Sequence, residues 1–99
     1  KILPKAGEGP SKLDRENGYY NLRFYVTYND GSKAISKVTG DMDPGYGSTS
    51  KMLSESAICL AKDNLDTISG VITPSTAMGD FLLERLIKKS GLTFNIKYL

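Results

Sequence analysis

The sequence has no histidine and a single cysteine, Cys59, among its 99 residues. Without histidine the chain lacks the most common general base and the most common metal ligand, so a Ser-His-Asp triad is excluded. One cysteine cannot form a disulfide within the chain. Such cysteine usage is typical of a reducing compartment, and we expect a cytoplasmic protein.

Long apolar runs and the features of a signal peptide are also missing, so we predict no membrane span. The net charge of +2 is small, and the 13 basic residues do not interleave with the six tyrosines. We therefore predict no binding to nucleic acid. The sequence opens on Lys1 rather than on an initiator methionine, and this favours a piece of a longer polypeptide.

A β-hairpin is predicted where polar and apolar residues alternate over Tyr19–Tyr28 and the chain returns over Lys33–Thr39. Residues 29–31 form the loop. A three-residue loop with its glycine in the left-handed conformation keeps one apolar face, whereas a two-residue loop would set Phe24 against Lys37. The predicted cross-strand pairs are Val26 with Ala34, Phe24 with Ser36 and Leu22 with Val38.

Two longer segments have the apolar spacing of helices, from about Thr49 to Asp63 and from about Pro74 to Ser90. Thr73 can cap the second helix, and Pro74 suits its first position because proline has no N–H to leave unpaired. The first helix is expected to bury Met52, Leu53, Ala57, Leu60 and Ala61 and to direct Lys51, Glu55 and Lys62 outward.

The last segment, Thr93–Tyr98, alternates again and predicts a third strand. Together the elements predict one α+β unit over residues 1–99, in which two helices pack on one face of an antiparallel sheet of about three strands. Residues 1–17 contain several prolines and glycines and are predicted to be a loop-like lead-in, in which Ser11–Glu16 can form a helical turn.

The loop before the first long helix, Gly40–Thr49, is the strongest candidate for a binding site. Its glycines free backbone N–H groups to bend toward an anion, and the start of a helix adds positive potential. The alternative is a plain strand-to-helix turn in which Asp41 and Asp43 accept backbone N–H groups. The residues predicted to face a substrate cleft are Gly45, Tyr46, Gly47, Ser48 and Thr49.

No cofactor or metal is expected to bind to this chain itself. Gly45-Tyr46-Gly47 lacks the third glycine and the strand–helix–strand unit of a dinucleotide fingerprint. The sequence that follows Asp41 and Asp43 does not place a glycine and a glutamate at the positions that an EF-hand requires. Cys59 lies in mid-helix with no cation predicted near it, so we expect it to pack in the core rather than act as a nucleophile.

Tyr25 and Ile35 form an apolar spot on the otherwise polar face of the hairpin. An apolar spot on a polar face is typical of a contact with another part of a protein or with a second copy. We therefore predict these two residues as interface residues, with isolated exposed side chains as the alternative.

Two blocks of sequence resemble the C-terminal end of the saccharopine dehydrogenase-like oxidoreductases. They are GVITPSTAMGDFLLERL at residues 70–86 and GDMDPGYGSTSKMLSESAICLA at residues 40–61, and Leu3–Ser11 adds a weaker match. In that family an N-terminal Rossmann domain binds NAD or NADP, and a second α+β domain shapes the substrate cleft and often the dimer interface. Some relatives look like enoyl reductases that act on lipid intermediates.

The resemblance implies that this chain is the C-terminal structural or substrate-side portion of an NAD(P)-dependent oxidoreductase and is inactive alone. Its expected partners are the missing Rossmann domain and, in a homodimer, a second copy. No catalytic residue of the family matches a position here, so none is assigned. Thr73, Ser75 and Thr76 are predicted only as further groups facing the cleft. The alternative is a stand-alone α+β module for protein interaction.

Overall fold

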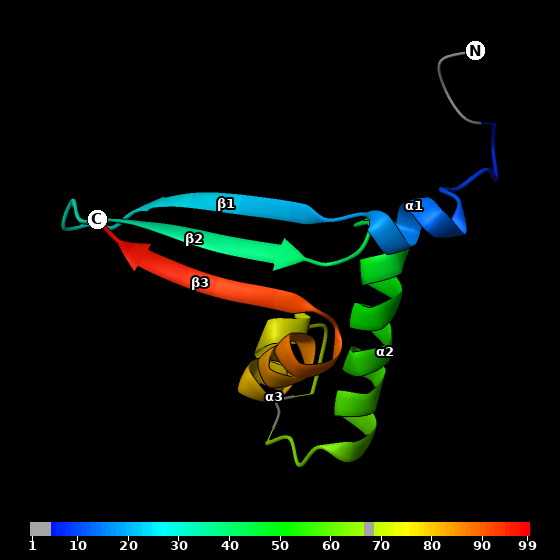
Figure 1. Cartoon of the computed structure of the whole chain (residues 1–99). Helices are drawn as coiled ribbons and strands as arrows, with labels where there is room; N and C mark the ends of the chain where they lie inside the picture. The colour runs from blue at the N-terminus through cyan, green and yellow to red at the C-terminus, as the bar shows by residue number, and fades with distance from the viewer. Residues whose placement is uncertain (1–4, 67–68) are drawn as a thin grey trace.

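The computed structural model describes residues 5–66 and 69–99, and it consists of a three-stranded sheet and three helices (Figure 1). Residues 1–4, including the first part of the predicted lead-in and of the Leu3–Ser11 match, lie outside the described residues. In chain order the elements are α1 (Lys12–Asn17), β1 (Tyr20–Thr27), β2 (Lys33–Gly40), α2 (Gly47–Lys62), α3 (Pro74–Lys89) and β3 (Leu92–Tyr98).

The sheet is antiparallel with the order β1-β2-β3, as expected for a hairpin followed by a C-terminal strand. The predicted register is confirmed, because Val26 pairs with Ala34, Phe24 with Ser36 and Leu22 with Val38. The hairpin loop also has the expected form. The Tyr28 N–H donates to the Ser32 carbonyl at 2.9 Å, and Gly31 has a φ of 84°.

The register gives the two faces of the sheet different chemistry. On one face, which we call the uncharged face, every side chain lacks a charge. Its members are Tyr20, Leu22, Phe24, Val26, Ala34, Ser36, Val38, Gly40, Leu92, Phe94, Ile96 and Tyr98. All four cations of the strands lie on the other face, which we call the basic face. They are Arg23, Lys33, Lys37 and Lys97.

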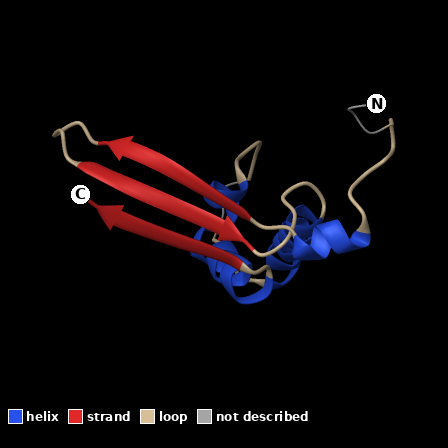
Figure 2. Cartoon of the chain, turned by 45° about the horizontal axis from the view of Figure 1, so that its top comes forward, coloured by secondary structure: helices blue, strands red, loops and turns tan. Residues whose placement is uncertain are grey.

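The helices gather at one end of the sheet, and the far ends of the strands extend beyond them (Figures 1 and 2). Packing between the layers runs from α2 to α3 and from α3 to β3. The α+β class is confirmed, but the helices cover less of a sheet face than expected. Consequently Phe24 and Ile96 on the uncharged face are 52% and 62% exposed.

Helix α2 faces α3 with a different side from the one that its apolar residues predict. Cys59 is fully buried, whereas Leu53 and Leu60 are 70% and 60% exposed, and Ala57 and Ala61 are exposed as well. The expected burial of these four residues is therefore wrong. The physical reason lies on α3, where Arg85 draws the acidic side of α2 inward through ion pairs described below.

The helical turn predicted at Ser11–Glu16 is confirmed as α1, so the second half of the lead-in is helical rather than a loop. Ser11 caps this helix in a capping box with Asp14, whose backbone N–H donates to the Ser11 hydroxyl at 3.1 Å. The segment directly before α3 is irregular. It forms no strand over residues 69–73, and Thr73 instead serves as the predicted N-cap of α3 by accepting the Thr76 N–H at 3.3 Å.

Helix α3 is interrupted at Gly79, which the apolar spacing of the sequence does not indicate. Gly79 has φ 45° and ψ −129°, a conformation outside the helical region and open mainly to glycine. The break leaves Met78 and Leu82 both buried against Cys59. A continuous helix from Pro74 to Lys89 is therefore replaced by two helical segments that share one core.

Substitution of Gly79 by alanine tests this break by the sign of its effect. No atom lies within 4 Å of the position of an added Cβ, so only backbone strain opposes the change. We expect Gly79→Ala to lower the free energy of unfolding by about 1–2 kcal/mol. In an unbroken helix the same change would raise it by about 1 kcal/mol. Urea unfolding followed by circular dichroism distinguishes the two, with Ser54→Ala on the exposed side of α2 as a stabilising control.

Candidate functional site

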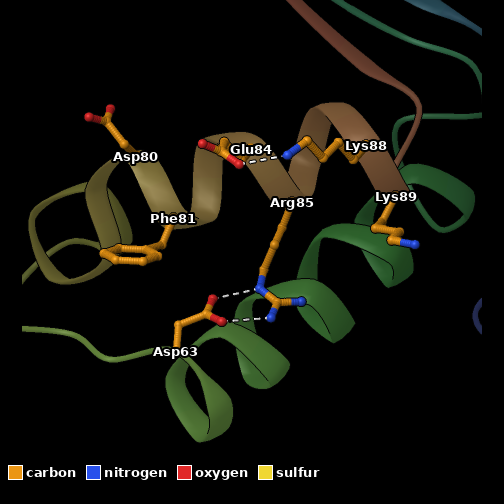
Figure 3. A pocket seen from close by; sticks show the side chains of 7 residues that line it. All are labelled: Asp63, Asp80, Phe81, Glu84, Arg85, Lys88 and Lys89. Carbon is orange, nitrogen blue, oxygen red and sulfur yellow. Dashed lines mark hydrogen bonds and ion pairs between the residues drawn. The ribbon is translucent and has the colours of Figure 1, made fainter.

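A groove of about 570 Å³ lies beside α3 and the end of α2 (Figure 3). Six of its seven lining side chains carry a charge, and the aromatic ring of Phe81 provides apolar surface. The lining residues are Asp63, Asp80, Phe81, Glu84, Arg85, Lys88 and Lys89. Figure 3 shows that Glu84 and Lys88 pair along α3, whereas Arg85 crosses to α2.

Arg85 makes the central contact of this groove. Its Nε and Nη2 atoms donate to the two carboxylate oxygens of Asp63 at 2.6 and 2.8 Å, and its Nη1 atom donates to Glu55 Oε2 at 3.2 Å. All three side chains are at least three-quarters shielded from solvent. A two-pronged contact of this kind is stronger and more specific in direction than a single ion pair.

The contact keeps both partners ionised. Hydrogen bonds from Arg85 and a further one from Cys59 lower the pKa of Asp63 from 3.8 to about 2. The hydrogen bond to Asp63 in turn raises the pKa of Arg85, so the guanidinium never loses its proton in water. A carboxylate and a guanidinium fixed in these states can position a ligand or a helix, but they cannot exchange protons with a substrate near neutral pH.

Cys59 lies beneath this contact and packs against Met78 and Leu82, which confirms the expected packing role. Arg85 is nevertheless close to it, so the expectation of no neighbouring cation is wrong. Burial raises the pKa of the Cys59 thiol, and Asp63 adds to this rise through a hydrogen bond and its negative charge. Because the thiol is fully buried and stays protonated, it is a poor nucleophile.

The glycine-rich loop before α2 already holds an anion from the protein itself. Asp43 accepts the backbone N–H groups of Gly45, Tyr46 and Gly47, with the shortest distances at 3.0, 3.2 and 2.5 Å respectively. The Gly47 hydrogen bond is the main cause of the lowered pKa of Asp43. Asp43 therefore caps the start of α2, and the N–H groups that a ligand anion would need are occupied.

The hydroxyl groups of Ser48 and Thr49 in this loop also form hydrogen bonds within the protein. Ser48 is fully buried and shares a 2.8 Å hydrogen bond with the hydroxyl of Tyr20. Thr49 donates to the Pro44 carbonyl at 2.7 Å. Among the predicted cleft residues of the loop, Gly45, Tyr46 and Thr49 are exposed, whereas Gly47 and Ser48 are buried.

The second group of predicted cleft residues surrounds the start of α3. The Thr73 hydroxyl contacts the hydroxyls of Ser75 and Thr76 at 3.1 and 2.9 Å, and all three residues are exposed. Thr76 lines a hollow of about 480 Å³, whereas Tyr46 and Gly47 line another of about 430 Å³. The two groups thus border different hollows, and their contact with a substrate stays a prediction.

The residues present do not fit a nicotinamide dinucleotide. The sheet is entirely antiparallel, whereas the dinucleotide fold places the pyrophosphate between parallel strands at the start of a helix. The glycine-rich loop before α2 uses its amides for Asp43. Within the described ranges, no three histidine, cysteine or acidic residues are grouped as a metal site, and no helix is long and apolar enough to cross a membrane.

The cluster around Arg85 was not among the predicted sites, although the sequence contains a signal for it. Glu55, Cys59 and Asp63 recur at intervals of four residues and therefore share one side of a helix. A carboxylate one turn before and one turn after a buried cysteine indicates that this side of the helix faces the interior and carries polar groups. The prediction instead followed the wider apolar stripe through Leu53 and Leu60.

The acid dependence of stability tests the contact between Asp63 and Arg85. Because the pKa of Asp63 is depressed in the folded state, the contact stabilises the fold fully above pH 3.8. This stabilisation is lost as the pH falls through about 2. We expect Asp63→Asn to remove this part of the acid loss and to lower stability near neutral pH. Urea midpoints between pH 2 and pH 6 measure it, and Asp66→Asn, which changes an exposed carboxylate, should leave the acid loss unchanged. Equal pH profiles for wild type and Asp63→Asn would contradict the contact.

Comparison with known proteins identifies relatives from mycobacteria. The chain is 46% identical to a protein named "Putative trans-acting enoyl reductase Rv2449c" from Mycobacterium tuberculosis. It is 41% and 39% identical to trans-acting enoyl reductases of Mycobacterium ulcerans and Mycobacterium bovis. Each match extends over 88 residues, which is 87% of this chain but 21% of the relative.

No family model and no solved structure matches the chain. The expected likeness to saccharopine dehydrogenase-like oxidoreductases is wrong, because the relatives bear the name of enoyl reductases and none links the chain to saccharopine dehydrogenase. The quoted blocks consist mainly of two helices and their starts, such as Thr73 with Pro74, and these features occur in many unrelated proteins. The chain spans about a fifth of the length of the curated relatives that it matches.

Proposed function

We propose that this chain serves as a non-catalytic α+β unit of a trans-acting enoyl reductase. The observation that carries the proposal is the similarity to proteins of that name, at 39–46% identity over 87% of the chain. Enoyl reduction adds a hydride and a proton across a carbon–carbon double bond, and NADH or NADPH supplies the hydride. We place that chemistry in the part of the relatives that the match does not reach.

The side chains of this unit support a role without chemistry of its own. Two largely shielded charged groups, Asp63 and Arg85, are held in fixed charge states by one another. The thiol of Cys59 is buried and protonated. Asp43 is used to cap α2. What the unit offers is a rigid helix pair and a sheet with two unlike faces.

We further propose that the uncharged face of the sheet packs against the remainder of a longer reductase, which contains the nicotinamide-binding domain. A three-stranded sheet with half-exposed Leu22, Phe24 and Phe94 is marginal by itself. Covering these side chains would stabilise it, since each apolar side chain removed from water contributes about 1.5–3 kcal/mol when burial is complete. No charged group would have to lose its hydration, because this face has none.

Exchange of this segment into a relative tests the assignment. The 88 aligned residues of the M. ulcerans relative are replaced by this chain, and NADPH or NADH oxidation is followed with an enoyl thioester. We expect the chimera to keep activity within about tenfold of its parent, and the 99-residue chain alone to have none. Turnover by the isolated chain, or a folded chimera without activity, would contradict the proposal.

Neighbouring residues on opposite faces of β1 test the packing of the uncharged face. In the same chimera, Phe24→Glu should prevent assembly because an unpaired carboxylate would be buried there. Arg23→Glu changes the adjacent residue on the basic face and should leave assembly intact. Yield, size-exclusion profile and reductase activity are the readouts. Equal behaviour of the two variants would show that the uncharged face is not covered.

A further inference from the structure

The basic face of the sheet carries four cations and no anion. Arg23, Lys33, Lys37 and Lys97 all lie on it, and none of the three strands contains an acidic residue. The ion pairs found among the described residues are formed by other cations, namely Lys12, Lys51, Arg85 and Lys88. The positive charge of this face is therefore not balanced by the strands that bear it.

The arrangement of these cations is unfavourable for the isolated sheet. Arg23 pairs directly with Lys37 across β1 and β2, and like charges in such a position repel each other. In the next row Tyr25 pairs with Ile35, and Ile35 pairs with Lys97. A shallow hollow of about 240 Å³ lies among these five side chains. Tyr25 is 76% exposed at this place.

The charges also decide which face can become internal in a larger assembly. Moving several unpaired cations out of water is costly, and an apolar cover would supply nothing to offset that cost. The uncharged face has no such penalty. The basic face therefore either stays in water or meets carboxylates on a partner.

We propose that the basic face is a docking surface for a partner protein whose own surface presents carboxylates around an apolar spot. Protein interfaces commonly combine aromatic and arginine side chains at the centre with a charged rim. Tyr25 and Ile35 provide the apolar centre here, and Arg23, Lys37 and Lys97 surround it. The proposal goes beyond the enoyl reductase assignment and does not depend on it.

Two other occupants are less favoured by the structure. An anionic membrane would attract the four cations, but Tyr25 and Ile35 supply little apolar surface for insertion. A second copy could offer its helical half, where residues 41–91 contain seven acidic and five basic residues. Such a contact joins unlike surfaces and would build a ring or a filament rather than a symmetric pair. Arg85, Lys51 and Lys88 also already pair with acidic groups there.

The test uses the full chain and a synthetic amphipathic helix with glutamates around a leucine patch. Binding is measured by fluorescence anisotropy, and the contact is mapped from amide chemical shifts in NMR spectra. We expect salt-sensitive binding with shifts centred on Tyr25, Ile35 and Lys37. The same peptide with lysine in place of glutamate, and vesicles of phosphatidylcholine with phosphatidylglycerol, should bind at least about tenfold more weakly.

Lys37→Glu separates binding from folding. It reverses a charge at the centre of the face and also replaces the repulsion with Arg23 by an attraction, so stability should be equal or higher. Affinity for the acidic peptide should fall at least about tenfold. Lys5→Glu makes the same change of charge in the loop before α1 and should have no effect. The proposal is overturned if the acidic peptide fails to bind or shifts other residues, if Lys5→Glu weakens binding as much, if the vesicles bind more tightly, or if the chain only self-associates.

Discussion

The contact of Arg85 with Asp63 and Glu55 determines how the helical half of the molecule is built. The guanidinium projects from the second half of α3 and holds Glu55 of α2 and Asp63 directly after it, and this fixes the rotation of α2 about its own axis. Cys59, which lies between those carboxylates along the helix, is thereby turned into the core with Met78 and Leu82. The apolar stripe of α2 is turned outward as a consequence.

The sequence predicted the sheet in detail because local chemistry controls it. The alternation around Phe24 and the glycine at position 31 together allow one register that separates apolar from charged side chains, and that register is observed. The start of α3 at Thr73 follows from capping in the same way. Each of these features depends on residues close together in the chain.

The errors have the opposite origin. The inward side of α2 depends on Arg85, which lies far along the chain from Glu55, and the break at Gly79 depends on the packing of both α3 segments on Cys59. At the glycine-rich loop the local alternative was correct for Asp43, because its carboxylate accepts backbone N–H groups of the turn as the sequence allows. Long-range partners decided the side that α2 turns inward and the break at Gly79, and spacing within one segment does not contain them.

The order of the sheet also affects how it can associate with strands of other chains. Within the described residues β1 and β3 are both edge strands, and each has one row of backbone hydrogen-bonding groups without a neighbour in the sheet. Flat apolar edges tend to recruit further strands and to aggregate. Arg23 in the middle of β1 and Lys97 near the end of β3 place a hydrated cation on each edge strand. Charges in these positions act as gatekeepers, which hinder an approaching strand from desolvating the edge.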